Sequence, residues 1–139
     1  MKKNKHFPPI MIKPIPQEHP MGCAVACVAS LLGIKYQEAW RLFGKPELSL
    51  RGIYCPQICR ALSNAGRDYS YSRLTGTEQI KHGAIVFIEK NGKYPCGHYL
   101  LKTKRGWMNP WINFPIITPA KAGFSKRLPG KPKWILSEK

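Results

Sequence analysis

The segment Cys23–Leu32 constrains the fold more than any other part of this sequence. It reads CAVACVASLL, contains no proline, and is a continuous run of small and branched apolar residues. The absence of alternation favours a buried helix over a strand, and Gly33 is well suited to cap the helix at its carboxyl end. A helix that is apolar on all sides must be covered by other elements, so we expect a globular domain around it.

Two further helices are expected in the first half of the chain, over Gln37–Phe43 and Pro56–Asn64. Each segment has apolar residues at helical spacing on one face. The second begins with proline and is followed by Gly66, which are the usual positions of these residues at helix ends. The apolar faces comprise Ala39, Trp40 and Phe43 in the first segment and Ile58, Cys59 and Leu62 in the second.

The second half of the chain has the pattern of strands. Ala84–Glu89 is a β-branched run, and the Asn91-Gly92 pair after it favours a type I′ hairpin turn. A second strand is expected over His98–Thr103, followed by a turn at 104–106. These features indicate an antiparallel meander.

The predicted fold class is α+β, with the N-terminal helices packed on a C-terminal antiparallel sheet. A third strand is expected to begin at Trp107, and Trp134–Leu136 is expected to close the sheet as a last short strand. Residues 1–20 contain five prolines, so residues 1–16 are predicted to form an extended arm. Residues 120–139 are predicted to form a basic tail. With no internal repeat and no long linker, a single domain over residues 1–139 is expected.

Acidic residues are scarce in this chain. It has 23 Lys and Arg residues against 7 Asp and Glu residues, a formal net charge of +16, and Asp68 is its single aspartate. Glycosidases that use paired carboxylates and sites that bind Ca²⁺ or Mg²⁺ through oxygen ligands are therefore excluded early.

The excess of positive charge predicts anionic partners. Residues 121–133 contain five basic residues and no acidic one. This cluster suits an acidic partner or inhibitor protein, anionic lipid or nucleic acid. Because the sequence has no RNA-binding motif, zinc finger or Gly-rich phosphate loop, contact with nucleic acid is expected to be non-specific. The basic residues are Lys121, Lys126, Arg127, Lys131 and Lys133.

The cysteines indicate the cellular compartment in which the protein is made. Five are present, and the N-terminus has no secretory signal peptide, so free thiols and synthesis in the cytoplasm are expected, with any export or delivery using no cleavable signal. No apolar stretch reaches the roughly 18 to 20 residues that a membrane-spanning helix needs. No membrane span is expected.

Four residues could form a catalytic site. Cys23 lies at the start of the buried helix, where backbone N–H groups and the helix dipole favour a nucleophilic thiolate. His98 opens a predicted strand after Gly97, which leaves room for another chain to approach, and is the candidate base. Asn109 lies across the next turn and could orient the imidazole. Gln17 could place its side-chain amide beside the thiol as an oxyanion donor.

The order Gln17, Cys23, His98 and Asn109, with the later Asn109-Pro-Trp111, resembles the papain-type cysteine peptidases. Within that group the segment GCAVACVASLLG is most similar to the bacteriocin-processing peptidase domain and its stand-alone bacterial relatives. The resemblance covers roughly residues 15–113. It implies a papain-like fold, a Cys23 nucleophile, a His98 base oriented by Asn109, a Gln17 oxyanion donor, and a Trp111 that shields the Asn–His hydrogen bond from water.

The chain departs from the bacteriocin-processing pattern at two places. That family usually has Asp-Cys-Gly and a later Asp-Pro, where this chain has Gly22-Cys23-Ala24 and Asn109-Pro110. The first difference is expected to alter the substrate cleft or the start of the helix. The second gives the asparagine that papain has at this position. In that family the peptidase domain is part of a transporter. The ATP-binding and membrane parts of such a transporter have no counterpart in this sequence, so coupling to export is not expected.

The sequence therefore predicts a cysteine peptidase that needs no cofactor or metal and acts on a peptide or protein. Several alternatives remain open. The same residues could deamidate or transfer groups to a partner protein, or the domain could bind without catalysis. A basic nucleic-acid-binding protein is also compatible with the composition, with its cysteines in the core or in a zinc site. Such a site would use Cys23, Cys27, Cys55 and Cys59 together with Cys96 or His98.

Overall fold

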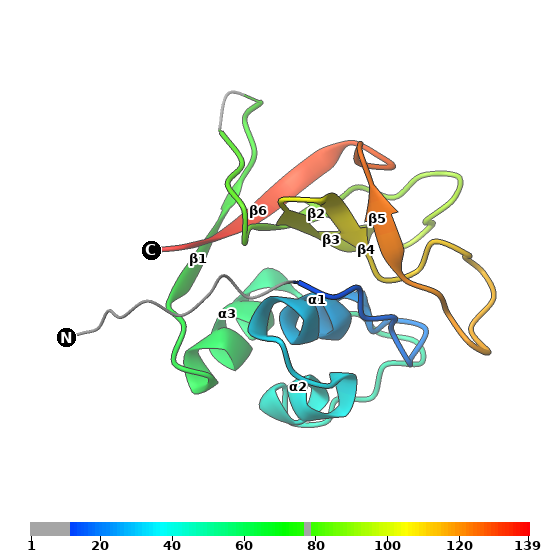
Figure 1. Cartoon of the computed structure of the whole chain (residues 1–139), viewed down its shortest axis with the longest axis horizontal. Helices are drawn as coiled ribbons and strands as arrows, with labels where there is room; N and C mark the ends of the chain where they lie inside the picture. The colour runs from blue at the N-terminus through cyan, green and yellow to red at the C-terminus, as the bar shows by residue number, and fades with distance from the viewer. Residues whose placement is uncertain (1–11, 77–78) are drawn as a thin grey trace.

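The computed structural model describes residues 12–76 and 79–139, and within them three helices lie on one side of a six-stranded antiparallel sheet (Figure 1). This arrangement confirms the predicted α+β class. The helices are α1 (Cys23–Leu32), α2 (Tyr36–Leu42) and α3 (Cys55–Asn64). The strands are β1 (Tyr69–Arg73), β2 (Ile85–Ile88), β3 (His98–Thr103), β4 (Gly106–Asn109), β5 (Gly123–Ser125) and β6 (Pro132–Glu138).

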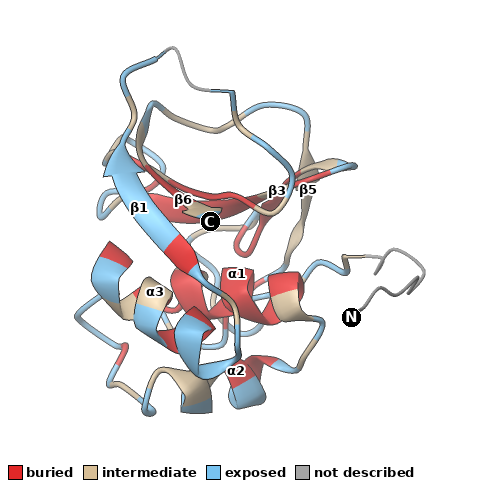
Figure 2. Cartoon of the chain, turned by 90° about the vertical axis from the view of Figure 1, so that its left-hand side faces the viewer, coloured by how far each residue is buried: buried red, intermediate tan, exposed pale blue. Residues whose placement is uncertain are grey.

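Helix α1 occupies the centre of the molecule. Its residues 24–31 are all buried, and it packs against β3 on one side and α2 on the other. Figure 2 shows this buried helix below the sheet, with α3 beside it and α2 on its far side from the sheet. The helix ends at Gly33, whose left-handed backbone, with a φ of 69°, lets its N–H donate to the carbonyl groups of Ala29 and Ser30. The prediction for this segment is confirmed.

Helices α2 and α3 each begin one residue before the predicted start. Both have a side chain that caps the first turn: Glu38 accepts a hydrogen bond from the Lys35 N–H, and Gln57 accepts one from the Tyr54 N–H. Their predicted apolar faces are turned to the core. Ala39, Ile58 and Leu62 are buried, whereas Trp40, Phe43 and Cys59 are half-buried against the same core.

The C-terminal segment is part of the sheet. The strand order is β1-β6-β2-β3-β4-β5, so β6 lies between β1 and β2, and β5 lies at one edge. The expected last strand at Trp134–Leu136 is present as the longer β6, which lies second from one edge of the sheet, so the predicted basic tail of residues 120–139 contributes β5 and β6 to the sheet. Two strands were not predicted. In β1 only Tyr69 is buried, and β5 has just three residues.

The loop between β2 and β3 differs from the expected hairpin turn. It spans residues 89–97, and Gly92 does not have the positive φ that a type I′ turn requires. Instead, Asn91 Oδ1 accepts hydrogen bonds from the N–H groups of Lys93 and Tyr94. The predicted type I′ turn is therefore wrong. The longer loop allows Tyr94 to fold back beside the first residue of β3.

Both faces of the central strands are covered. A large core lies between the helices and the sheet, and a second cluster lies on the opposite face, with Val86, Ile88 and Leu100 among its members. This double burial explains why the β2 segment is apolar without alternation. No helix among the described residues is long and apolar enough to cross a bilayer.

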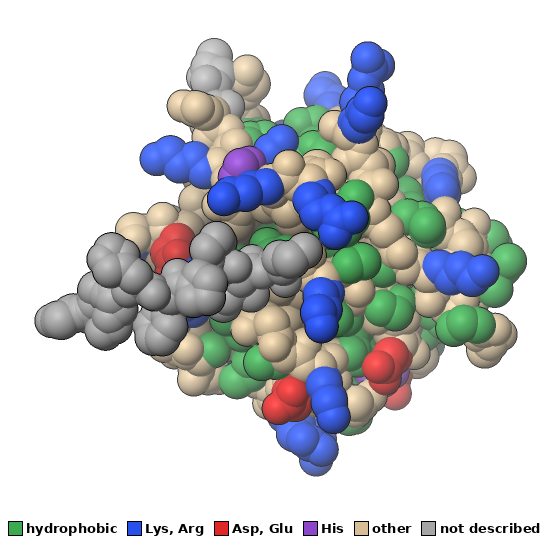
Figure 3. Space-filling view, viewed as in Figure 1, with side chains coloured by type: hydrophobic (Ala, Val, Ile, Leu, Met, Phe, Trp, Pro, Cys, Tyr) green, Lys and Arg blue, Asp and Glu red, His purple; other side chains and the backbone are tan. Residues whose placement is uncertain are grey.

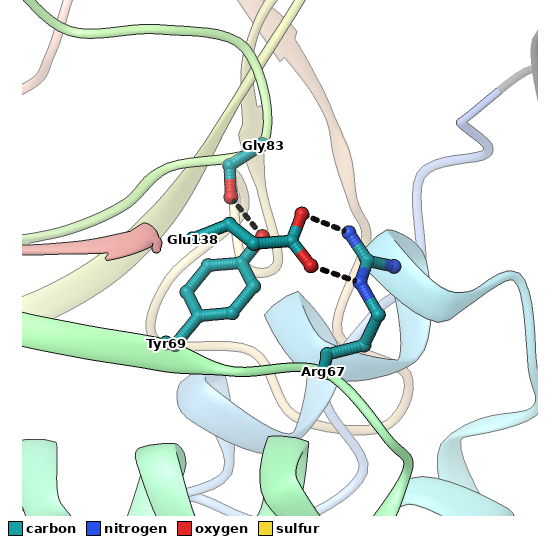
Figure 4. Close-up of polar contacts among 4 residues, drawn as sticks. All are labelled: Arg67, Tyr69, Gly83 and Glu138. Carbon is teal, nitrogen blue, oxygen red and sulfur yellow. Dashed lines mark hydrogen bonds and ion pairs between the residues drawn. The ribbon is translucent and has the colours of Figure 1, made fainter.

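A polar cluster joins the edge strand β1 to its neighbours (Figure 4). Two guanidinium nitrogens of Arg67 donate to the Glu138 carboxylate at 2.6 and 2.8 Å. The Tyr69 hydroxyl donates to the Gly83 carbonyl at 2.8 Å. These contacts join β1 to the end of β6 and to the chain before β2. The paired, bidentate geometry makes this ion pair stronger than an isolated surface pair.

Candidate active site

The predicted site residues meet around one cavity. Gln17, Cys23, His98 and Trp111 line a cleft of about 1010 Å³, and Asn109 is hydrogen-bonded to His98. These residues come from the segment before α1, the first turn of α1, the start of β3, the end of β4 and the loop after it. The fold therefore brings together every residue that was assigned a catalytic or shielding role.

Cys23 is the first residue of α1, and close packing fixes the start of this helix. Gly22 is the N-cap residue, and a Cβ placed on it would lie 2.0 Å from the Tyr36 hydroxyl. That hydroxyl is held by His19 Nδ1 at 2.8 Å. The glycine that departs from the bacteriocin-processing pattern thus allows α2 to approach the start of α1.

The thiol of Cys23 is half-buried, and two opposing effects act on its pKa. Loss of solvent around the sulfur raises the pKa to about 11. Hydrogen bonds from backbone groups of Tyr99, Ala24 and Cys23 itself act in the lowering direction, and they are the weaker effect. The contribution expected from the helix start is therefore present, but it is outweighed by burial.

His98 opens β3 and is 2% exposed. The preceding Gly97 has a φ of +77°, and a Cβ at this position would lie 2.2 Å from the ring of Phe87. Glycine is needed here for both its backbone conformation and its size. The expectation that Gly97 allows a close approach at this position is confirmed.

Asn109 fixes the protonation of the imidazole. Its Oδ1 lies 2.7 Å from His98 Nε2 and also accepts a hydrogen bond from the Trp111 N–H at 2.9 Å. Its Nδ2 donates to the Tyr94 hydroxyl at 3.0 Å. Because the Trp111 N–H can only donate, the atom facing His98 is an acceptor, and Nε2 must carry the proton. The neutral imidazole therefore keeps a free lone pair on Nδ1.

Tyr94 is a further part of this network and lies outside the predicted site. Its ring stacks on the His98 ring with centroids 4.0 Å apart and an angle of 3°. Its hydroxyl accepts from Asn109 and donates to the Trp111 carbonyl at 2.8 Å. Tyr94 lies between the predicted turn and the strand predicted from His98, and no sequence pattern marks it, so only the structure reveals this contact.

Burial acts on His98 in the direction opposite to its effect on the thiol. It lowers the pKa of the imidazole to about 4, and the nearby Lys93 adds to this decrease, while the hydrogen bond to Asn109 counteracts it. The described structure contains no hydrogen bond between the Cys23 thiol and His98. In this state a neutral thiol and a neutral imidazole share the cleft.

Gln17 is 2% exposed, and its amide is already engaged. Nε2 donates to the carbonyl groups of His19 and Pro20, each at 3.0 Å. Oε1 is buried and has no hydrogen-bond partner among the described residues. Reversing the amide would place Oε1 against two carbonyl oxygens, so the orientation is fixed. A role as an oxyanion donor requires one of these two bonds to be released.

The sequence comparisons give no relative. No protein-family model matches the chain, and no curated protein matches its sequence. The chemistry of this site must be judged from its own residues.

The remaining histidines and cysteines have other environments. His19 packs against Tyr36 and Trp40 and does not line the cleft, and His82 is exposed. Cys27 is fully buried in the core, and all five cysteines are free, which confirms the expected free thiols. His6 lies outside the described residues. Within the described ranges, no group of three or more His, Cys, Asp or Glu residues could hold a metal, which argues against the zinc alternative.

The basic residues are distributed over the surface. Figure 3 shows Lys and Arg side chains scattered across one face, with few acidic side chains among them. On that face they form no single continuous patch. Lys2, Lys3 and Lys5 lie outside the described residues.

Proposed function

We propose that this protein is a cysteine peptidase of the papain type, with Cys23 as nucleophile and His98 as base. The observation that carries the proposal is the hydrogen-bond network around Asn109. It places the proton of the neutral imidazole on Nε2 and leaves Nδ1 able to accept a proton in the cleft that Cys23 lines. A buried structural histidine also needs a hydrogen-bond partner, so it is the position of His98 in the same cleft as a thiol at a helix start that favours the catalytic role.

The pKa values favour proton transfer during attack over a preformed ion pair. As Cys23 Sγ attacks the substrate carbonyl carbon, its proton moves to His98 Nδ1. This step requires the two atoms to approach within hydrogen-bond distance, a contact that free enzymes often make only with substrate bound. Asn109 stabilises the resulting imidazolium through Nε2, and Trp111 and Tyr94 keep the Asn109 amide in place.

The tetrahedral intermediate then collapses. Its oxyanion can accept hydrogen bonds from the backbone N–H of Cys23, which has no backbone acceptor in the described chain. Gln17 contributes a second donor if the oxyanion replaces one of its carbonyl partners. His98 Nδ1 returns its proton to the leaving amine as the C–N bond breaks. Water, deprotonated by the same nitrogen, hydrolyses the thioester and restores the thiol.

The proposal is tested by exposing the purified protein to a complex mixture of unstructured peptides and identifying new chain ends by mass spectrometry. The wild-type protein and a Cys59→Ala control should cleave the same bonds, because Cys59 is half-buried on α3 and does not line the cleft. Cys23→Ala should produce no new ends. Acid quenching should trap a peptidyl thioester on Cys23 of the wild-type protein.

Other results would contradict the proposal. Equal cleavage by Cys23→Ala would place the chemistry elsewhere. Intact peptides with modified side chains would instead indicate the deamidase or transferase alternative. Intact, unmodified peptides together with the absence of a thioester would leave a binding domain without catalysis.

A further inference from the structure

The mouth of the cleft is unusually apolar for an exposed surface. The large hydrophobic side chains that remain exposed in the described chain include Leu50, Tyr54 and Tyr71, which are 88, 77 and 45% exposed, and all three line the cleft. Leu50 and Tyr54 lie before α3, and Tyr71 lies on β1. An apolar cluster that converges on one cavity from separate elements indicates a binding surface.

The sheet side of this surface is held in place by aromatic contacts. Tyr71 and Trp134 meet edge to face with centroids 6.2 Å apart, and the Arg73 guanidinium lies 5.9 Å from the Trp134 ring centroid. Phe87 packs against Tyr99 at 4.8 Å deeper in the cleft. These rings lose little freedom when a ligand binds, which favours affinity.

The charged residues of the cleft are all of one sign. Arg51 and Lys133 line it, and no Asp or Glu does. Neither cation forms an ion pair with a described residue. Arg51 is exposed and Lys133 is half-buried, so both are available to an anionic group beside the apolar surface.

We propose that the cleft selects an extended peptide segment that carries a bulky apolar side chain and an acidic side chain near the scissile bond. The apolar side chain packs on Leu50, Tyr54 and Tyr71, and the carboxylate pairs with Arg51 or Lys133. This inference rests on the proposed function for the presence of a scissile bond. The cleft volume lies at the upper end of ordinary ligand sites, about 300–1,000 Å³, which suits a short peptide.

A peptide accounts for this surface better than a nucleic acid does. Nucleic-acid grooves follow the phosphate backbone with a row of cations, whereas this cleft offers two. The nearby thiol and imidazole also suit an amide carbonyl.

The test measures binding separately from cleavage. Fluorescence anisotropy follows labelled peptides of equal length on Cys23→Ala, with Cys23→Ser as a second inactive form. One peptide carries Glu and Leu beside the central bond, a second has Ser in place of Leu, and a third has Lys in place of Glu. An unlabelled single-stranded oligonucleotide is the competitor.

The Glu-Leu peptide should bind most tightly. Replacing its Leu should weaken binding about tenfold or more, and replacing its Glu should weaken binding about threefold to tenfold. Adding Arg51→Gln and Lys133→Gln should remove the preference for Glu over Lys and keep the preference for Leu over Ser. Lys104→Gln with Lys126→Gln is the matched control, because it removes the same charge from exposed positions outside the cleft and should preserve both preferences.

Equal affinities for the three peptides would overturn the inference, as would an equal loss of the Glu preference in the control double variant. Displacement by the oligonucleotide at lower concentrations than by unlabelled peptide would assign the cleft to nucleic acid. Failure of the proposed function gives a different result: the wild-type protein would bind the Glu-Leu peptide with the expected preference and leave it intact. Cleavage without any preference would overturn the inference alone.

Discussion

The two halves of the candidate active site differ in how firmly the protein holds them. The imidazole half, His98 with Asn109, Tyr94 and Trp111, is joined by hydrogen bonds of 2.7 to 3.0 Å and by ring stacking. The thiol half, Cys23 at the start of α1, has no side-chain cap and no hydrogen bond to the base in the described structure. The imidazole is thus held in place by side-chain hydrogen bonds, whereas the thiol is not.

This difference suggests that the imidazole stays fixed while the thiol adjusts. A buried polar network is stable only when all its members are satisfied, so the imidazole cannot adjust without disturbing several residues. The thiol is half-buried at a helix end and can adjust when a substrate arrives. We therefore expect the alkylation rate of Cys23 to depend on how strongly the thiol is shielded from solvent. Substitutions in the imidazole half should change both catalytic activity and the free energy of unfolding.

The largest expected effect concerns the reactivity of the free thiol. Because the pKa of Cys23 is raised to about 11, its thiolate fraction should increase about tenfold for each pH unit below that value. Alkylation of Cys23 by iodoacetamide, followed by peptide mapping, should accelerate about 1000-fold between pH 7 and pH 10. A small thiol levels off above about pH 9 and is the reference.

A plateau in the alkylation rate of Cys23 at or below neutral pH would contradict the difference between the thiol half and the imidazole half. Such a plateau would mean that a thiolate–imidazolium pair already exists in the free protein. The thiol half would then be as preorganised as the imidazole half.

The second prediction concerns the effect of His98 on stability. Its pKa is lowered from 6.5 to about 4 in the folded protein, so between these values the unfolded chain binds a proton that the folded chain does not. Stability is therefore lost as the pH falls through this window, by about 3 kcal/mol in total. Urea unfolding of the wild-type protein and His98→Gln, followed from pH 7.5 to pH 4.5, should show most of this decrease in the wild type alone.

His82→Gln is the matched control, because His82 is exposed and does not line the cleft. It should retain the wild-type dependence on pH. An unchanged dependence in His98→Gln would mean that His98 is not held in its neutral form by burial.

The third prediction concerns Asn109. Replacement by Ala leaves His98 Nε2, the Tyr94 hydroxyl and the Trp111 N–H each without one partner. We expect kcat to fall about 100-fold, because the imidazole is no longer held as the Nε2–H tautomer, and the free energy of unfolding to fall by about 1–3 kcal/mol. Peptide hydrolysis and urea unfolding measure the two effects.

Asn64→Ala is a control that removes one exposed hydrogen bond, from Asn64 Nδ2 to the Leu42 carbonyl. It should change neither quantity by a comparable amount. A large loss of stability with unchanged kcat in Asn109→Ala would reduce Asn109 to a structural residue.

The sequence predicts those parts of the fold in which local pattern and tertiary environment agree. Helix α1 is apolar throughout and ends at a left-handed glycine, so its bounds follow from the sequence alone. Strand β1 reads YSYSR and is mostly exposed, so nothing in its pattern distinguishes it from a polar loop. Its existence depends on β6, which pairs with it from the other end of the chain.

The candidate site shows the same limit. The residue types and their order predict Gln17, Cys23, His98 and Asn109 as site residues, because chemistry restricts which side chains can serve and the order resembles that of the papain-type peptidases. The degree to which each side chain is buried cannot be predicted from residue type and order. The start of a helix predicts a lowered pKa for the thiol, yet the packing around Cys23 raises it to about 11.

The smallest expected effect belongs to Tyr94, the residue that the sequence does not mark. Tyr94→Phe keeps the ring that stacks on His98 and removes the two hydrogen bonds of the hydroxyl. Asn109 Nδ2 then loses its acceptor, while Oδ1 still receives the Trp111 N–H. Since one restraint on the amide remains, kcat should fall only about tenfold, less than in Asn109→Ala.

A further measurement separates positioning from general stability. The ¹⁵N chemical shifts of His98 report which ring nitrogen is protonated, and in Tyr94→Phe they should show some of the Nδ1–H tautomer, which a loss of stability alone would not produce. Tyr69→Phe is the matched control, because it removes the hydroxyl of a buried tyrosine bonded to the Gly83 carbonyl, and neither residue lines the cleft. If Tyr94→Phe lowers kcat no more than Tyr69→Phe and leaves the tautomer unchanged, Asn109 and Trp111 alone hold the imidazole, and fewer residues fix the imidazole half than the structure indicates.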